Sequence, residues 1–581
     1  MNRNIDRTSF WRNPKNRVIL ILGSLVLVIG LLAFFAYRNA TFQNKRSEES
    51  TLVMQSVLDT LQVEAYFRDD FKRRDLHRQF AKFYTDRDYR LAWSTLKKPL
   101  PLADSLFAAL QGASLEGLQP DDYNVKELKQ MRDSVFQRSL LKIKYKRPDL
   151  LRLVQLDFQL TASYLMYASH LATGRFNPSK VDANWMINPQ RNADLAKSLE
   201  KALKSRNINK ALLDLLPGRN DYRQLRGQLA RYHQVQQQGG WSGVQASQQY
   251  RPGKSGAAVA ALRKRLALSG DLPNGGGADS TLFDDTLVQA VKGFQERHGL
   301  TPSGKVDDAT LRALNVPVDR RIAQISLNLE RLRWLPEDLG KEYLMVNVPA
   351  FDLKIVKNNR EDLRMRVVVG KEFNSTPIFR DTMEYIVFSP DWTVPRSIAT
   401  KEILPIVQRN PDYLLTNNYQ VYDSWDARDT TALDPHAIDW ASLSEDNFSY
   451  RVVQGPGTGN ALGAVKFMFP NKMDIYLHDT PANHLFNRSE RAFSHGCVRV
   501  EKPKELAEYL LRDTNKWNEA SIAEAMQQDK PENVKLPRKL PVFLVYLTAF
   551  TDENGRVNFR DDVYGHDASQ LEALVKKSAR L

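Results

Sequence analysis

The spacing of apolar residues changes once along this chain, near Trp334, and the change separates two kinds of local structure. Before it, apolar residues recur every three or four positions, as in residues 149–171. This spacing predicts amphipathic helices, because one helical turn holds 3.6 residues. After it, short β-branched and aromatic runs alternate with Asn, Asp, Gly and Pro, which is typical of strands. A chain of 581 residues also exceeds the usual size of one core. We therefore expect a multidomain α+β protein.

The half of the chain that favours strands has one interruption. Strands are predicted at residues 343–348, 353–357, 365–369, 384–388, 451–453, 465–468, 474–477, 497–500 and 542–547. From about 393 to 447 the pattern lapses into a helical stretch at 396–408 and an Asp- and Asn-rich loop. Insertions of this size are usually lids, binding loops or disordered segments. We interpret this one as a lid, and expect short helices at 320–334 and 502–512.

Residues 18–37 form an almost uninterrupted apolar run, about the length that crosses a bilayer as a helix. Only Asp6 opposes the basic residues before it, which are Arg3, Arg7, Arg12, Lys15 and Arg17. The positive flank of a span stays in the cytoplasm, so residues 1–17 are expected inside and the rest of the chain outside. A cleaved signal peptide is the alternative, but no Ala-x-Ala site follows. We therefore favour an uncleaved, single-pass transmembrane signal anchor at 18–37.

The helical half divides at a linker rich in Gly, Ser and Gln, at about residues 236–256. Residues 41–240 are expected to form a helical scaffold domain. Residues 253–316 hold three amphipathic segments, with Gly299, Pro302 and Gly304 breaking the chain between the last two. The net charge is +15, but the basic residues are scattered among acids. This pattern argues against a surface that binds nucleic acid.

One cysteine, Cys497, stands in the whole chain, within Ser494-His495-Gly496-Cys497-Val498-Arg499. A lone cysteine is most often a small buried apolar residue. Here histidine, glycine and arginine flank it, and a free thiol outside the cell is open to oxidation. These neighbours favour a nucleophile over a packing residue. The N–H groups of Gly496 and Cys497 are then candidates for stabilising a tetrahedral oxyanion.

Three nearby histidines could accept the thiol proton: His478, His484 and His495. His478 ends a predicted strand nineteen residues before the cysteine, whereas His495 precedes it by two and would lie on the same side of an extended segment. Spacing alone leaves the choice between them open. A metal site built from these residues is disfavoured, since no pair has metal-ligand spacing. We expect neither a metal nor a cofactor.

Two parts of the sequence resemble known families. The segment 253–316 is similar to the three-helix type of peptidoglycan-binding module, with a generic three-helix bundle as the alternative; the matching residues are Thr286, Ala290, Val291, Phe294, Gln295, His298, Gly299, Leu300, Gly304, Thr310 and Leu314. His478-Asp479-Thr480-Pro481, followed by the cysteine segment, resembles the signature of L,D-transpeptidases with a YkuD-type catalytic domain. That resemblance implies a mostly-β catalytic domain at 320–550, with the lid at about 393–447. Residues 551–581 are expected to form a C-terminal tail.

The resemblance also implies roles for individual residues. Cys497 would be the nucleophile and His478 the base, with the backbone carbonyl of Asp479 orienting the imidazole. His495, Ser494 and Gly496 would support the site. Three residues are expected to contact substrate: Arg499, Trp392 and Tyr476. Arg499 stands where the family often has Asn, and either binds a substrate carboxylate or forms a structural ion pair.

The activity implied is acyl transfer in the bacterial cell wall. A cysteine thioester would form on one peptidoglycan stem tetrapeptide with release of D-Ala, and the amine of a second would then give a 3-3 crosslink. The implied partners are the donor and acceptor stem tetrapeptides, the inner membrane, through the anchor, and other wall synthases, with the catalytic part in the periplasm. The alternatives are an L,D-carboxypeptidase, an enzyme attaching protein to peptidoglycan, or a non-catalytic wall-binding tether.

Overall fold

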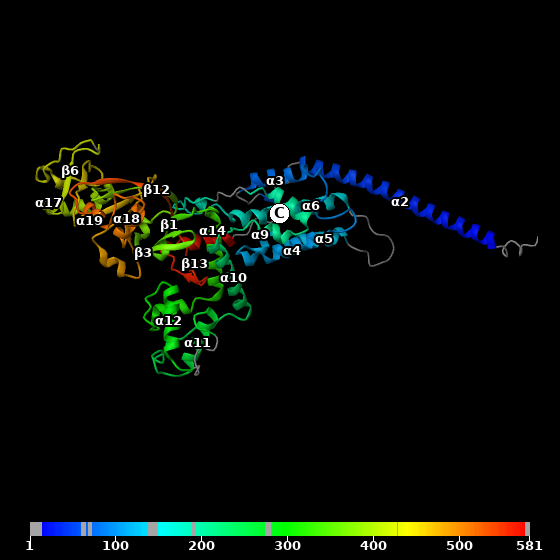
Figure 1. Cartoon of the computed structure of the whole chain (residues 1–581), viewed down its shortest axis with the longest axis horizontal. Helices are drawn as coiled ribbons and strands as arrows, with labels where there is room; N and C mark the ends of the chain where they lie inside the picture. Colours follow the sequence, from blue (N-terminus) through cyan, green and yellow to red (C-terminus); the bar gives the residue numbers. More distant parts are fainter. Residues whose placement is uncertain are drawn as a thin grey trace, which may run out of the picture.

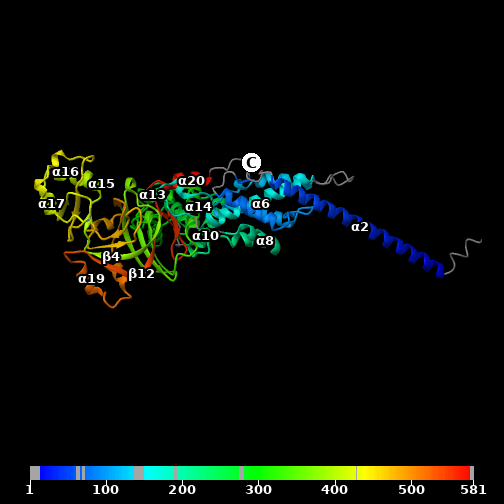
Figure 2. The ribbon, with the colours of Figure 1, turned by 90° about the horizontal axis from the view of Figure 1, so that it is seen from above.

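The computed structural model of the chain describes residues 14–59, 66–67, 72–136, 149–188, 193–273, 281–426 and 428–575. The molecule is elongated (Figure 1). A β-rich body lies at one end, a helical body follows it, and the helix α2 (Pro14–Asp59) projects from the other end. The view from above shows the same order along the long axis (Figure 2).

The long helix α2 covers most of the predicted anchor. Its last turns pack on the scaffold through Met54, which is fully buried. Farther toward the N-terminus its large apolar side chains, such as Leu32 and Phe35, are exposed. Within the part of the chain that is described, no helix combines the length and the hydropathy that a membrane span requires. The predicted cytoplasmic segment lies mostly outside the described residues, and the side chains of residues 18–24 lie outside them as well, so the anchor stays a prediction.

The scaffold is a cluster of helices around α6 (Leu150–Thr173), which is buried on nearly all sides (Figure 1). The helix begins where the Asp149 carboxylate accepts a hydrogen bond from the N–H of Leu151, and ends at Gly174, which has a φ of +86°. The helices around it are α3 (Arg73–Thr85), α4 (Pro101–Gln111), α5 (Val125–Phe136), α8 (Leu195–Ser205) and α9 (Ile208–Leu213). The predicted helical character of this region is confirmed.

The small module consists of α11 (Ala257–Ser269), α12 (Asp285–Arg297) and α13 (Asp308–Leu314), and it lies to one side of the long axis (Figure 1). Asp284 and Asp307 cap the last two helices by accepting backbone N–H groups. All three helices contribute to a separate apolar core. The three predicted amphipathic segments are therefore helices.

Nine described strands form the main sheet, in the order β10-β3-β11-β9-β8-β4-β12-β1-β2. Because β2 also pairs with β3, the sheet closes on itself and has few free edges. The strands are β1 (Glu342–Asn347), β2 (Asp352–Lys357), β3 (Arg360–Gly370), β4 (Arg380–Phe388), β8 (Val465–Met468), β9 (Leu477–His478), β10 (Ala492–Ser494), β11 (Val498–Val500) and β12 (Glu532–Val545). Helices α18 (Pro503–Leu511) and α19 (Glu519–Ala525) follow β11.

The strand predicted at 474–477 is displaced in the structure. Asp474 has a φ of +52°, which an extended strand does not allow, and β9 starts only at Leu477. The side chain of Asn471 holds this turn: it donates to the carbonyls of Phe469 and Ile475 and accepts the N–H of Ile475. The prediction failed here because a side chain replaces the partner strand as the hydrogen-bonding partner of the backbone.

The insertion has its own apolar core, which was not predicted from the sequence, where most of this region was interpreted as a loop. Strands β5 (Trp392–Thr393), β7 (Arg451–Gln454) and β6 (Tyr419–Tyr422) form a separate small sheet. The predicted helical stretch consists of α15 (Arg396–Ile398), the π-helical η6 (Ala399–Ile403) and α16 (Leu404–Val407), followed by α17 (Asp412–Thr416). Val394, Val407 and Val421 are fully buried among them. The insertion is a small folded unit at the far end of the molecule (Figure 1).

The residues after 550 do not form a detached tail. They fold into β13 (Ala549–Thr551), β14 (Val557–Phe559) and α20 (His566–Val575), and Phe559 is 1% exposed. Their apolar side chains join the core of the main sheet, together with those of α14 (Val318–Trp334) and α10 (Asn220–Gln237). The helix α10, which the sequence assigned to the scaffold, therefore shares its core with the β-rich body.

Candidate active site

The site lies on the face of the sheet that points away from its core. In β8, β9 and β11 the core-facing residues Val465, Leu477 and Val498 are fully buried, and the intervening residues face the other way. The registers place Lys466 opposite His478 and His478 opposite Arg499. Strand pairing therefore sets a histidine between two cationic side chains, an arrangement that the linear sequence does not reveal.

His478 is held by the backbone of its neighbour. Its ring is 4% exposed, and Nδ1 lies 2.6 Å from the carbonyl oxygen of Asp479. A carbonyl can only accept, so Nδ1 carries the hydrogen and Nε2 of the neutral ring is left as an acceptor. The Asp479 carboxylate is engaged elsewhere, since it accepts the N–H groups of Ala464 and Thr480. The carbonyl, not the carboxylate, orients this ring.

Burial and the neighbouring charges keep this imidazole neutral. Loss of solvation, then the charge of Arg499, lowers the pKa of His478 to about 3. The ring is thus neutral at any pH near neutrality.

Cys497 is half-buried beside this row, and its thiol is protonated at rest. Burial raises the pKa of Cys497 to about 11, and hydrogen bonds from Tyr476 oppose that rise. The Sγ atom contacts the carbonyl oxygen of Asp474 at 3.7 Å. Among the described residues no hydrogen bond joins Sγ to His478. The raised pKa of the thiol and the lowered pKa of the imidazole describe a resting pair in which both groups are neutral.

The two predicted oxyanion donors differ in their availability. The N–H of Gly496 donates to Ser494 Oγ at 3.2 Å, and Ser494 Oγ donates to the carbonyl of Cys497 at 2.5 Å. No acceptor for the N–H of Cys497 is found in the described structure. Of the two, only the Cys497 N–H is free to meet an oxyanion. Gly496 has a φ of +122°, which explains why glycine stands before the cysteine.

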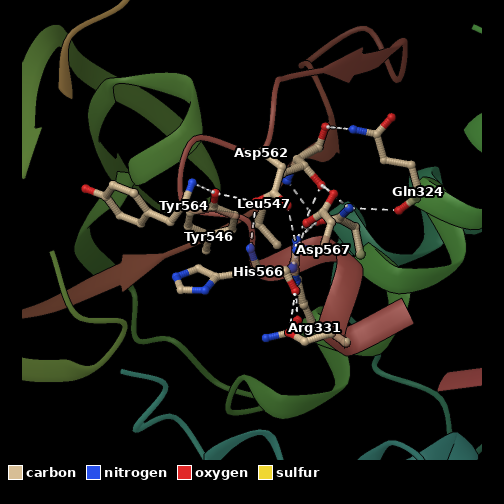
Figure 3. A network of polar contacts seen from close by, with 12 residues as sticks. Gln324, Arg331, Tyr546, Leu547, Asp562, Tyr564, His566 and Asp567 are labelled. Carbon is tan, nitrogen blue, oxygen red and sulfur yellow. Dashed lines mark hydrogen bonds and ion pairs between the residues drawn. The ribbon is translucent and has the colours of Figure 1, made fainter. Parts of the chain in front are cut away.

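The C-terminal segment supports the nucleophile loop, which sequence reasoning missed. Thr376 Oγ1 accepts the N–H of Gly370 at 2.9 Å and donates to the carbonyl of Gly496 at 2.7 Å. The hydroxyl of Tyr564 donates to the carbonyl of Gly370 at 2.7 Å and accepts the N–H of Thr376 at 3.3 Å. Tyr564 is held in turn by Tyr546, whose hydroxyl accepts its N–H (Figure 3). No local sequence signal links these positions.

The same network ties α20 to α14 (Figure 3). The Tyr546 hydroxyl donates to Asp562 at 2.6 Å, and Arg331 of α14 pairs with Asp567 of α20 at 2.8 Å. Arg331 is 2% exposed, so its pairing holds the two helices together in a buried setting. The support behind the nucleophile loop is therefore anchored in the helical body.

His495 contacts the insertion. The residue is exposed, and its Nε2 lies 2.6 Å from Oε1 of Glu402 in η6. The two residues are 93 positions apart, so no local sequence pattern predicts this pair. His495 links the nucleophile loop to the folded lid.

The residues predicted to contact substrate fall into two groups. Arg499 and Tyr476 lie in the row beside the thiol, and the ring centroid of Tyr476 is 5.7 Å from that of His478. Arg499 Nε is buried and has no hydrogen-bond partner in the described structure. Trp392, in contrast, belongs to β5 of the lid and is half-buried against the lid core. Lys466, for which no role was predicted, also lies in the row beside the thiol.

No grouping of His, Cys, Asp or Glu suited to a metal ion is found among the described residues.

Comparison with protein families matches three consecutive parts of the chain. Residues 78–229 match a "Scaffold domain", residues 255–314 a "Putative peptidoglycan binding domain", and residues 341–522 the YkuD "L,D-transpeptidase catalytic domain". The site described above lies inside the third match, whereas Tyr546 and Tyr564 lie beyond its end.

A "Putative L,D-transpeptidase" of Haemophilus influenzae is 36% identical to this chain over 244 residues, which are 42% of this chain and 48% of that protein. The chain thus spans about half the length of this relative.

Among solved structures, an L,D-transpeptidase from Xylanimonas cellulosilytica is 14% identical, with 52% of this chain and 99% of that chain covered, and a TM-score of 0.17. One from Stackebrandtia nassauensis is 13% identical, with 52% and 96% covered, and a TM-score of 0.21. These structural overlaps are too low to support any inference. The chain therefore carries a segment that matches the YkuD L,D-transpeptidase catalytic domain, at residues 341–522, joined to one that matches a peptidoglycan-binding domain, at residues 255–314.

Proposed function

We propose that this chain is an L,D-transpeptidase that forms 3-3 crosslinks between peptidoglycan stem peptides through a thioester on Cys497. The observation that carries the proposal is the row Lys466–His478–Arg499 beside the half-buried thiol, within the matched catalytic domain. A nucleophile, an oriented neutral base and two cations that form no ion pair with any described residue lie on one face of the sheet. This combination suits attack on a peptide carbonyl next to a carboxylate.

In the first step, Sγ attacks the carbonyl between the L-centre of diaminopimelate and the terminal D-Ala. His478 Nε2 takes the thiol proton as the carbon–sulfur bond forms, and the N–H of Cys497 stabilises the oxyanion. The C–N bond then breaks, and the proton passes from His478 to the departing D-Ala amine. A thioester remains on the enzyme.

In the second step, the side-chain amine of another stem peptide attacks the thioester. His478 removes a proton from that amine and returns it to the sulfur as the new amide forms. Water competes for the same thioester, and hydrolysis would make the enzyme an L,D-carboxypeptidase. The lid, linked to the nucleophile loop by the pair between His495 and Glu402, would limit the access of water.

The cations have a distinct role in this proposal. Burial lowers the pKa of both Lys466 and Arg499, so each is charged in surroundings that disfavour charge. The carboxylate of the terminal D-Ala can relieve that cost by pairing with Arg499, whose Nε has no partner among the described residues. We assign Arg499 to recognition of this carboxylate rather than to a structural ion pair.

We further propose that residues 18–37 anchor the chain in the inner membrane of a bacterium, with the catalytic domain in the periplasm. The exposed apolar side chains along α2 support this, because such a surface needs an apolar partner. The test is carbonate extraction of cell membranes. The full chain should stay in the pellet, and a variant lacking residues 1–40 should be released. Release of the full chain would contradict the anchor.

Acylation by a carbapenem, followed by intact mass, tests the catalytic proposal. The wild-type chain should form a stable adduct, and Cys497→Ala should form none. His478→Ala should slow acylation far more than His495→Ala, with His484→Ala as the control, since His484 is an exposed histidine of the same region. If the wild-type chain is folded but does not react, the catalytic proposal fails, and the non-catalytic wall-binding tether becomes the favoured alternative.

Incubation with a disaccharide-tetrapeptide then identifies the reaction. Dimers with loss of D-Ala indicate transpeptidation, whereas tripeptide without dimer indicates an L,D-carboxypeptidase.

A further inference from the structure

A cavity of about 220 Å³ lies between the peptidoglycan-binding module and the C-terminal strands. The ends of α12 and α13 line one side, and α14 and β14 line the other. The cavity reaches the surface, because Arg312 and Asp561 in its lining are exposed. None of the residues of the catalytic row belongs to the lining.

Two guanidinium groups, that of the buried Arg321 and that of the half-buried Arg560, line this cavity without forming an ion pair among the described residues. Arg321 is 7% exposed and donates to the side-chain oxygen of Gln324 and the carbonyl of Ala313. Arg560 donates to the backbone carbonyls of Arg297 and Phe559. Among the described residues, neither forms an ion pair.

Burial lowers the pKa of Arg321 to about 10, and that of Arg560 to about 10 as well. Asp561 is the one acid in the lining, against the cations Arg312, Arg321 and Arg560. The carboxylates of Asp561 and, for Arg560, Asp352 attract these cations without forming an ion pair with them, so an anion that entered the cavity and paired with the cations directly would be stabilised.

A neutral acceptor lies beside these cations. His298 Nδ1 is 2.7 Å from the carbonyl of Phe294, and therefore carries the hydrogen. The ring stacks on Phe294, with centroids 3.8 Å apart, and also faces Phe559 at 5.5 Å. Burial holds the pKa of His298 well below its usual value, so Nε2 stays an acceptor. A ligand suited to this cavity combines an anionic group with a nearby N–H or O–H donor.

We propose that this cavity binds the carboxylate end of a peptidoglycan stem peptide, as a second site apart from Cys497. A peptide end supplies a carboxylate and an adjacent amide N–H, which match the guanidinium groups and His298 Nε2. The volume admits the end of a peptide but not a glycan strand. The proposal rests on the proposed function, because that function makes stem peptides the polymer on which the chain acts.

This assignment explains why the module packs against the catalytic body. Residues from the module and from the catalytic body both line the cavity, so a bound peptide contacts both. Binding would hold a second stem peptide on the same molecule while Cys497 reacts, and would raise its effective concentration near the thioester.

The test uses the full chain with Cys497 acylated by a carbapenem, so that the active site is occupied. The probe is the tetrapeptide L-alanyl-D-glutamyl-diaminopimelyl-D-alanine, titrated by calorimetry, with inorganic phosphate as a second probe. We expect one tetrapeptide per chain. Loss of a charge-assisted hydrogen bond should weaken binding about tenfold or more in Arg321→Gln. The exposed Arg312→Gln should weaken it about threefold, as for a surface charge.

Arg251→Gln is the matched control, because Arg251 is an exposed arginine near the module outside the cavity. It should bind as the wild-type chain does. Unchanged affinity in both Arg312→Gln and Arg321→Gln would overturn the proposal, and Arg312→Gln alone decides if the other variant does not fold. Phosphate binding as tightly as the tetrapeptide would also overturn it, in favour of a general anion site.

The outcomes separate this proposal from the proposed function. If the carbapenem does not acylate Cys497, the catalytic proposal fails. The second site is then tested by comparing the tetrapeptide affinities of the unmodified wild-type chain and its unmodified variants. If acylation occurs but the cavity variants bind normally, only the second site fails.

Discussion

Substitution of Tyr564 by phenylalanine removes one hydroxyl behind the nucleophile loop and keeps the ring. This hydroxyl satisfies the carbonyl of Gly370 and the N–H of Thr376, both in a buried setting. An unsatisfied buried polar group costs about 1–3 kcal/mol, and the 3.3 Å contact is the weaker of the two. We therefore expect Tyr564→Phe to lower the free energy of unfolding by about 2–3 kcal/mol.

The effect on catalysis has a separate cause. Thr376 positions the carbonyl of Gly496, and therefore the next N–H, that of Cys497. Removal of an oxyanion donor costs about 100- to 1000-fold in rate, and displacement of its support should cost less. We expect the acylation rate at saturating carbapenem to fall about tenfold, with little change in the half-saturating concentration.

The assay is a time course of intact mass at several carbapenem concentrations, combined with urea unfolding. Tyr546→Phe is the control: its hydroxyl also makes two hydrogen bonds, to Asp562 at 2.6 Å and from the N–H of Tyr564 at 2.9 Å. It should lose similar stability but less of the acylation rate, because the Tyr564 hydroxyl keeps its own hydrogen bonds to Gly370 and Thr376. Equal loss of the saturated rate in both variants, or a normal rate in Tyr564→Phe, would refute the reasoning.

Three other outcomes follow from the site. Because burial raises the pKa of Cys497 to about 11, alkylation of the resting enzyme by iodoacetamide should be slow at pH 7 and rise about tenfold per pH unit up to pH 9; a plateau above pH 6 would instead indicate a thiolate–imidazolium pair. Gly496→Ala should strain a backbone at φ +122° by about 1–3 kcal/mol and abolish acylation in a folded protein, as judged by circular dichroism and intact mass. Glu402→Gln weakens the exposed pair with His495, which contributes at most about 1 kcal/mol. It should therefore raise the ratio of tripeptide to dimer about two- to fivefold. An unchanged ratio would show that this pair does not help the lid to limit the access of water to the thioester.

Local features of this fold were predictable because they depend on neighbours in the chain. The helix over residues 149–171 was recognisable from its apolar spacing, and the caps at Asp284 and Asp307 mark two helix starts. The strands β1, β2, β8 and β11 lie close to their predicted ranges, whereas β3, β4 and β12 begin four to ten residues earlier than predicted and β10 was not predicted. Strand β9 begins later than predicted, because the side chain of Asn471 sets the turn before it. Family resemblance, rather than periodicity, singled out His478 among three histidines.

The organisation of the insertion and of the C-terminus was not predictable in the same way. The lid core joins Val394 to Val421 and Val452, from short segments whose individual apolar runs are weak. The final strands carry little periodicity of their own, and Phe559 is buried because α10 and α14 cover it. Such segments gain their stability from packing against distant residues rather than from local propensity.

The sequence by itself determined the helical and β-rich halves and the caps, and it indicated a lone thiol with three histidines nearby as the candidate site. Tertiary structure alone decided that Lys466 and Arg499 flank that histidine, that Glu402 reaches the nucleophile loop, and that Tyr564 supports it from behind. The physical reason is distance along the chain. Periodicity and capping report on contacts within a few residues, whereas strand register and burial join residues as distant as Gly370 and Tyr564, which are 194 positions apart.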